Sequence, residues 1–343
     1  MLFEYFLLLF IVFASTNAQP VYKQSNDCPG NYKWSANGIT IMGNGYGTDP
    51  DQFQFPEGLF IEPKTQILYV TDVSNNRVQK RYSNGEIKTA AGQANCEGGS
   101  TPDKLDGPRD VVADENENVY VVDEGNQRVQ FWKKNAKSGK MVAGDETRGS
   151  SLNQFSYPFR LVLDSKKNIF VSDTQNERIM NWSSIYIPKT SAGQIVAGGH
   201  GAGLNLYQLN GPVGLYLDEP NDDLYIVNGN SHSVTQYNMD SYGDKTIVAG
   251  IPGRPGNSAA QLYSPEGLTR DKYGNLYITD SGNHRIQMFC PGAVFGITIA
   301  GTGNRGNASN ELNLPRAVAF DSDMNLYVTD TYNYRVQKFN RIK

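Results

Sequence analysis

The three histidines of this 343-residue chain, His200, His232 and His284, are the residues whose type could bind a catalytic metal. A zinc site needs three or four side chains that converge and are held by fixed neighbours. His232 and His284, however, occupy one variable position of a repeating unit. The other copies carry at this position Asn76, Gln127, Glu177 and Tyr334. Such variation favours solvent-facing turn residues, so we expect no cofactor and no metal ligands, with a zinc or calcium site as the alternative left open.

Motifs for nucleophilic or phosphate chemistry are not found. The sequence has no Gly-x-Ser-x-Gly motif and no plausible set of Ser, His and Asp. Two glycine-rich stretches, GNGYG from Gly43 and GTGNRG from Gly301, do not open a helix, so they supply no row of free N–H groups for a phosphate. We therefore predict no catalytic residue.

A polar pattern, Asp-x-x-Asn-x-Arg, recurs in stretches such as TDVSNNRVQKR from Thr71 and TDSGNHRIQMF from Thr279. An acid at a strand end can accept backbone N–H groups across a turn, and Arg can reach back to its carboxylate. In one unit all three positions change together, to Asn228, Ser231 and Ser233, as a coupled buried network predicts. We interpret the pattern as structural. Its acid–arginine pairs are Asp72 and Arg77, Asp123 and Arg128, Asp173 and Arg178, Asp280 and Arg285, and Asp330 and Arg335.

The elements that must position these residues follow a period of roughly 50 residues. A proline opens each unit, at Pro56, Pro108, Pro158, Pro212, Pro265 and Pro315. Each unit then has short runs rich in Ile, Val, Tyr and Phe, separated by turns of Gly, Asn and Asp. Four strands per unit predict an all-β chain that forms a β-propeller of four-stranded antiparallel blades.

The ring is expected to close through its N-terminal strand. The sixth unit ends one strand short at Lys343. The stretch GITIMGNGYG from Gly38 matches GITIAGTGNRG of the fifth unit, so we expect the segment from residue 39 to complete the last blade. The propeller is predicted to span residues 39–343 and to have six blades.

The units, which contain P-x-G, Y-V-T-D, N-x-R-V-Q-K-F and A-G, resemble those of NHL-repeat proteins, over roughly residues 39–343. The resemblance implies a six-bladed propeller, which agrees with the number of units. It implies less about activity, because the family includes RNA-binding modules attached to ubiquitin ligases, a secreted peptide-amidating lyase and extracellular domains without assigned chemistry. A calcium-dependent lactonase also uses a six-bladed propeller.

The charge and the N-terminus indicate a secreted protein. The net charge of −4 disfavours nucleic acid and anionic lipid as partners. An apolar stretch, residues 5–14, is too short to span a bilayer but fits a signal peptide, with Thr16 and Ala18 at the cleavage site. No Lys or Arg precedes it, and an uncleaved anchor is the alternative. We predict a signal peptide at residues 1–18, a lead segment at 19–38 and no stable membrane insertion.

Secretion permits disulfides and glycans. Of the three cysteines, Cys28 precedes the closing strand and Cys290 ends a strand beside the last blade, whereas Cys96 falls in a crossover on the opposite face. This topology favours a Cys28–Cys290 disulfide. Asn181 and Asn307 begin glycosylation sequons.

The residue after each opening proline lies where the innermost strands begin. Around the ring, these mouth residues are Glu57, Arg109, Phe159, Val213, Glu266 and Arg316. Either their charges simply pair with one another, or they form a mouth that binds a peptide, a protein or a small amphipathic ligand. We predict a secreted binding scaffold. The alternative is an extracellular metal-dependent enzyme, like a peptide-amidating lyase or a lactonase, and an RNA-binding module is disfavoured by the charge.

Overall fold

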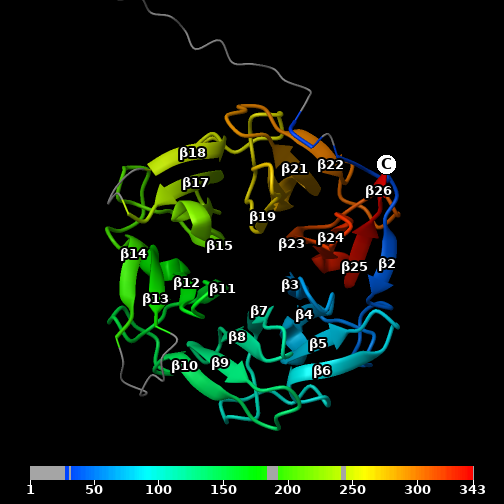
Figure 1. Ribbon diagram of the computed structural model, residues 1–343, viewed down its shortest axis with the longest axis vertical. Helices are drawn as coiled ribbons and strands as arrows, with labels where there is room; N and C mark the ends of the chain where they lie inside the picture. The colour runs from blue at the N-terminus through cyan, green and yellow to red at the C-terminus, as the bar shows by residue number, and fades with distance from the viewer. Residues whose placement is uncertain (1–27, 31, 184–191, 241–244, 343) are drawn as a thin grey trace, which may run out of the picture.

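The structure is a ring of six four-stranded antiparallel sheets around a central axis (Figure 1). In the computed structural model the described residues are 28–30, 32–183, 192–240 and 245–342. The predicted signal peptide and the first part of the lead segment, residues 19–27, lie outside them. No helix in these ranges is long and apolar enough to cross a membrane. The predicted all-β, six-bladed propeller is confirmed.

Five blades consist of consecutive strands that run from the axis outward (Figure 1). Blade 1 contains β3 (Pro56–Ile61), β4 (Leu68–Asp72), β5 (Arg77–Arg81) and β6 (Ile87–Gly92), and blade 2 contains β7 (Pro108–Ala113), β8 (Val119–Asp123), β9 (Arg128–Trp132) and β10 (Lys140–Gly144). Blade 3 contains β11 (Pro158–Leu163), β12 (Ile169–Asp173), β13 (Arg178–Trp182) and β14 (Gln194–Gly198). Blade 4 contains β15 (Pro212–Asp218), β16 (Asp223–Asn228), β17 (Ser233–Asn238) and β18 (Lys245–Gly250). Blade 5 contains β19 (Leu268–Arg270), β20 (Leu276–Asp280), β21 (Arg285–Phe289) and β22 (Ile297–Ala300), so its first strand begins three residues after Pro265.

Blade 6 combines both ends of the chain, as predicted. Its strands are β23 (Pro315–Phe320), β24 (Leu326–Asp330), β25 (Arg335–Phe339) and, outermost, β2 (Ile39–Met42). Strand β2 is antiparallel to β25, with Thr40 opposite Gln337. Part of the lead segment is also structured, because β1 (Lys33–Trp34) pairs with β26 (Arg341–Ile342). The predicted Cys28–Cys290 disulfide is present, with a Cα–Cα distance of 5.4 Å, and it fastens the start of the described chain to blade 5.

The core consists of hydrophobic clusters between neighbouring blades. Between blades 1 and 2, Tyr69 and Val78 meet Val111 and Trp132 around Leu105 of the crossover, and each is at most 1% exposed. A single blade presents two apolar faces that it cannot bury alone. Closing the ring therefore buries a cluster at each junction and fixes the inner strands around the axis.

The aspartates of the repeated polar pattern join the second strand of a blade to the turn that follows it. They also bind the crossover, which is the segment that leads from the outermost strand of the preceding blade to the innermost strand of this one. In blade 1, Asp72 Oδ1 accepts a hydrogen bond from the main-chain N–H of Gln54 at 2.7 Å. Asp72 Oδ2 accepts hydrogen bonds from Asn75 Nδ2 at 2.8 Å and from Arg77 Nε at 2.9 Å. Burial raises the pKa of the Asp72 carboxyl, and these hydrogen bonds oppose that rise. The same acid–arginine bond, at 2.7 Å, joins Asp123 to Arg128, Asp173 to Arg178, Asp280 to Arg285, and Asp330 to Arg335.

The arginines of the pattern also bind the crossover from the preceding blade. Arg77 Nη2 donates to the carbonyl oxygens of Asp49 and Gln52, at 2.7 and 3.1 Å. The equivalent arginines bind the equivalent pair of carbonyls in blades 2, 3, 5 and 6. The network is thus a structural connection between successive blades.

Blade 4 lacks the arginine but keeps a cation at the same carbonyls. Ser231 and Ser233 are buried, and their hydroxyl oxygens lie 3.0 Å apart. Lys245 Nζ, from the outermost strand β18, donates to the carbonyl oxygens of Asn205 and Gln208, at 3.2 and 2.7 Å. The joint loss of the acid and the arginine is visible in the sequence, whereas this replacement from another strand is not.

The variable turn position that holds His232 and His284 is partly exposed, and its side chains also bind the next blade. His232 Nδ1 accepts the N–H of Ser264, and His284 Nδ1 accepts the N–H of Leu314, each at 3.1 Å. The donors directly precede the opening prolines of the next blades and have left-handed φ values of 45° and 50°. Other blades make the equivalent bond with the side chains of Asn76, Gln127 and Glu177. What these side chains share is a hydrogen-bond acceptor.

Candidate functional site

The four charged mouth residues pair with one another at one end of the central channel. Arg109 Nη1 lies 2.9 Å from Glu57 Oε1, and Arg316 Nη1 lies 2.8 Å from Glu266 Oε2 and 3.5 Å from Glu57 Oε1. Arg109 also pairs with Glu124 at 3.2 Å. The two apolar mouth residues are half-buried. The guanidinium carbon of Arg109 lies 5.6 Å from the ring centroid of Phe159. Val213 packs on the hydrophobic cluster between blades 4 and 5. The structure thus shows the charge pairing, and ligand binding at this mouth stays a prediction.

A buried ion pair lies next along the channel. Arg160 Nη1 is 3.1 Å from Asp110 Oδ1, and both residues are buried. Arg160 Nη2 donates to the carbonyl oxygen of Arg316 at 3.0 Å, which connects blade 3 to blade 6 on the opposite side of the ring. Burial raises the pKa of the Asp110 carboxyl, and the neighbouring Arg160 opposes this. The pair forms a polar floor for the space beyond it.

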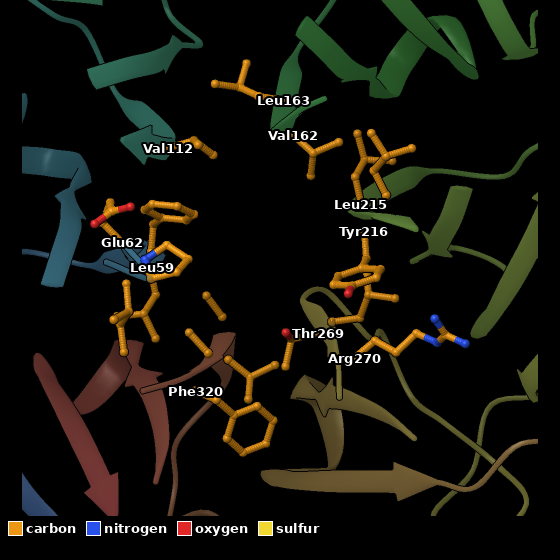
Figure 2. Close-up of a pocket in the computed structure, with 18 of the residues that line it drawn as sticks. Leu59, Glu62, Val112, Val162, Leu163, Leu215, Tyr216, Thr269, Arg270 and Phe320 are labelled. Carbon is orange, nitrogen blue, oxygen red and sulfur yellow. The ribbon is translucent and has the colours of Figure 1, made fainter. Parts of the chain in front are cut away.

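Beyond this floor the channel widens into a cavity of about 790 Å³, lined by the inner strands of all six blades (Figure 2). None of the six mouth residues, all of which are described, lines it. One layer of its wall comes from the residue four places after each opening proline. This layer consists of Phe60, Val112, Val162, Tyr216, Thr269 and Ala319. This cavity is therefore at the opposite end of the channel from the mouth.

Two members of this layer, Tyr216 and Thr269, are polar and lie on neighbouring blades (Figure 2). Within the described ranges, neither hydroxyl makes a hydrogen bond. Burial raises the pKa of the Tyr216 phenol, and the nearby Arg270 guanidinium opposes this. A comparison of the residues next to the prolines does not reach these two positions. The same comparison three places further along would have found these two hydroxyls in an otherwise apolar set.

Several charged groups of the cavity wall are already paired, whereas Lys167, Lys272 and Arg341 form no ion pair within the described residues. Arg270 forms an ion pair with Asp218, and its guanidinium lies 5.3 Å from the Tyr225 ring centroid. At the rim, Glu62 accepts the main-chain N–H groups of Lys64 and Thr65, at 2.9 and 2.5 Å. The acids at the equivalent rim positions are Asp114, Asp164, Asp218, Asp271 and Asp321. Several of these likewise accept hydrogen bonds within their own turns.

Candidate metal ligands are not brought together in the described part of the chain. No group of three or more His, Cys, Asp or Glu residues there is placed to hold a metal ion. His232 and His284 bind main-chain N–H groups, and His200 lies exposed, with its ring 6.1 Å from that of Tyr207. We therefore derive no chemical step through a metal.

The two sequons have different surroundings. Asn181 is half-buried on β13, and its Oδ1 is a buried atom without a hydrogen-bond partner. Asn307 is exposed in the crossover between blades 5 and 6. Only Asn307 offers its side chain freely to solvent.

The fold and the repeated network define the class of this protein as a six-bladed β-propeller. Residues 105–131, 262–289 and 312–339 match the NHL repeat. These segments belong to blades 2, 5 and 6 and include the acid–arginine pairs described above. The chain is thus a six-bladed propeller that contains NHL repeats.

The sequence similarity to known relatives covers only part of each relative's length. The mouse NHL repeat-containing protein 3 is 30% identical over 95 residues, which is 27% of this chain and 26% of the relative. The Arabidopsis thaliana protein SUPPRESSOR OF QUENCHING 1, chloroplastic, is 25% identical over 270 residues, which is 73% of this chain and 21% of the relative. The chain thus spans about a quarter or less of the length of each of these two relatives.

Solved structures share the fold at low identity. A gluconolactonase from Xanthomonas campestris has a TM-score of 0.61 and 14% identity, covering 92% of this chain and 95% of that one. An auxiliary nutrient binding protein from Bacteroides ovatus has a TM-score of 0.63 and 16% identity, covering 91% and 78%. A streptogramin B lyase has a TM-score of 0.55 and 14% identity, covering 89% and 98%. These similarities establish the fold alone.

Proposed function

We propose that this propeller is a binding protein whose ligand places an apolar part in the central cavity. The observation that carries this proposal is the cavity of about 790 Å³, walled mainly by apolar side chains of all six inner strands. Ligand sites typically have volumes of roughly 300–1,000 Å³ and mostly apolar walls with a few polar groups. The paired charges of the mouth and the Arg160–Asp110 floor leave the end near Glu62 as the entrance.

The test is the binding of a neutral fluorescent probe, N-phenyl-1-naphthylamine, by wild-type protein and two matched variants. Val112→Phe adds a ring to the cavity wall, whereas Val213→Phe adds the same ring at the mouth, where Phe159 already occupies an equivalent position. We expect saturable binding that Val112→Phe weakens by about tenfold or more, because overpacking costs roughly 1–3 kcal/mol. Val213→Phe should leave the affinity within about twofold.

Two outcomes would overturn the proposal: no saturable binding by wild-type protein, or a loss confined to Val213→Phe. The second outcome would place the ligand at the mouth, as the sequence suggested. Circular dichroism should show that both variants are folded. Ala319→Phe, which introduces the residue found at the equivalent position 60, tests the cavity again if Val112→Phe does not fold.

A metal-dependent lyase or lactonase remains the second candidate. Its support is the shared fold with a gluconolactonase and a streptogramin B lyase. Elemental analysis of purified protein separates the two candidates. Zinc or calcium bound at one ion per chain after dialysis would favour the enzyme, and its absence would favour the binding protein.

The proposed site of action is outside the cell, which the disulfide and the exposed Asn307 sequon support. Expression of the full chain in a eukaryotic secretory system should release protein that lacks residues 1–18 into the medium. We expect a glycan on Asn307. The Asn307→Gln variant should lack this glycan, whereas the Asn181→Gln variant should still carry it. Retention inside the cell, or an intact N-terminus, would contradict secretion by signal-peptide cleavage.

A further inference from the structure

The cavity has one polar side. Tyr216 on β15 and Thr269 on β19 hold equivalent places on neighbouring blades, and Figure 2 shows both side chains facing the cavity. The same layer is apolar in the other blades, where it consists of Phe60, Val112, Val162 and Ala319. No feature common to all repeats therefore requires a polar residue at this position.

Both hydroxyls are half-buried, and within the described ranges neither has a hydrogen-bond partner. Their remaining partner is water. An apolar ligand that fills the cavity displaces this water, and a ligand without a polar group would leave both hydroxyls unpaired. A ligand that hydrogen-bonds to them avoids this loss.

Beside Tyr216, an ionised ligand group would find no unpaired cation. The charged groups that act on its phenol are Arg270, Asp218 and Asp271. The cavity-lining cations that form no ion pair within the described residues, Lys167, Lys272 and Arg341, are not among them. Arg270 is paired with Asp218, and Arg160 is paired with Asp110. Glu62 is occupied by main-chain N–H groups of its own turn. Burying an unpaired ion beside these satisfied pairs is unfavourable, whereas a neutral polar group needs only the two hydroxyls.

We infer that the ligand is a neutral amphipathic molecule, with an apolar body and a hydroxyl, carbonyl or carboxamide group bound by Tyr216 and Thr269. This inference rests on the proposed function. The two hydroxyls determine specificity, because they select the polar group, and the apolar layer accommodates the rest of the molecule.

The test compares three ligands of equal chain length, 1-octanol, octanoate and octylammonium, as displacers of N-phenyl-1-naphthylamine from the wild-type protein. We expect 1-octanol to bind roughly tenfold more tightly than either ion. Tyr216→Phe and Thr269→Val should each weaken 1-octanol by roughly fivefold and leave the affinity for the probe unchanged. Tyr332→Phe removes a hydroxyl from a tyrosine that packs on Phe55, at the other end of the channel, and should change neither affinity.

Each remaining outcome overturns one of the two proposals. No binding of the probe defeats the proposed function. Binding of the probe with octanoate or octylammonium as the tightest displacer defeats the neutral ligand but leaves the cavity as the site. An unchanged affinity for 1-octanol in both hydroxyl variants defeats the roles of Tyr216 and Thr269.

Discussion

Lys245 Nζ lies 2.7 Å from the carbonyl oxygen of Gln208 and occupies the place that an arginine guanidinium takes in the other five blades. In blade 1 the equivalent bond joins Arg77 to the carbonyl oxygen of Gln52. The lysine comes from the outermost strand, whereas the arginines come from the third. The crossover therefore requires a cation at its carbonyls, and the chain supplies one from either strand.

This relationship predicts that Lys245→Met destabilises the protein. The change leaves the carbonyl oxygens of Asn205 and Gln208 without their donor, at a cost of about 1–3 kcal/mol. Lys245→Arg keeps a cation within reach and should cost less. Chemical denaturation measures both, and equal stability of wild type and Lys245→Met would show that the contact contributes nothing.

A pH dependence should follow from His232 and His284. Burial lowers the pKa of both imidazoles, with Asp280 acting in the opposite direction and Arg305 reinforcing the shift at His284. Their neutral Nδ1 atoms accept main-chain N–H groups, so the folded state takes up protons less readily than the unfolded chain. The stability from these bonds is complete above the unfolded pKa of about 6.5 and is lost as the pH falls through the lower folded values.

The control for this prediction already exists in the chain, because Gln127 makes the same bond in blade 2. The double variant His232→Gln and His284→Gln should match the wild type at pH 7.5 and lose less stability at pH 5.5. The difference should be about 1 kcal/mol for each hydrogen bond. Melting temperatures at the two pH values measure it, and parallel curves for both proteins would contradict the assignment.

Closure of the ring should be sensitive to Gly43, which follows β2. Its φ is +93°, and an added Cβ would lie 2.2 Å from the carbonyl oxygen of Tyr334 in the same blade. Gly45 has the same φ but nothing within 4 Å of an added Cβ. Gly45→Ala should therefore cost about 1–2 kcal/mol from backbone strain alone, and Gly43→Ala roughly 3 kcal/mol or more. Urea titration compares the two, and equal costs would mean that β2 can move away from β25 without loss.

The Cys28–Cys290 disulfide should stabilise the folded protein. It spans 262 residues and holds the start of the described chain against blade 5. Replacing both cysteines by serine should lower the free energy of unfolding by about 2–5 kcal/mol. Cys96→Ser, which removes the remaining cysteine without breaking a bond, is the control and should leave the melting temperature unchanged. A reductant that lowers the melting temperature of the double variant as much as that of the wild type would contradict this role.

The sequence by itself determined the architecture, because the constraints that define it are local and repeated. Each unit specifies its own strands through apolar alternation and its own turn through the Asp-x-x-Asn-x-Arg pattern. The number of copies and the strand missing at the C-terminus then fixed the six blades and their closure by β2. The partners within each unit could be read from the sequence for the same reason, since Asp72 and Arg77 are only five residues apart.

Only the tertiary structure decided which residues meet across the ring. Arg160 contacts the carbonyl oxygen of Arg316, 156 positions away, and Lys245 replaces an arginine of a different strand. The width of the channel at each end depends on how six side chains of one layer pack together, and no single unit contains that information. The repeat fixed where each side chain lies within its blade, whereas the charge pairs of the mouth, the cavity and its two free hydroxyls arise only when the six inner strands converge on one axis.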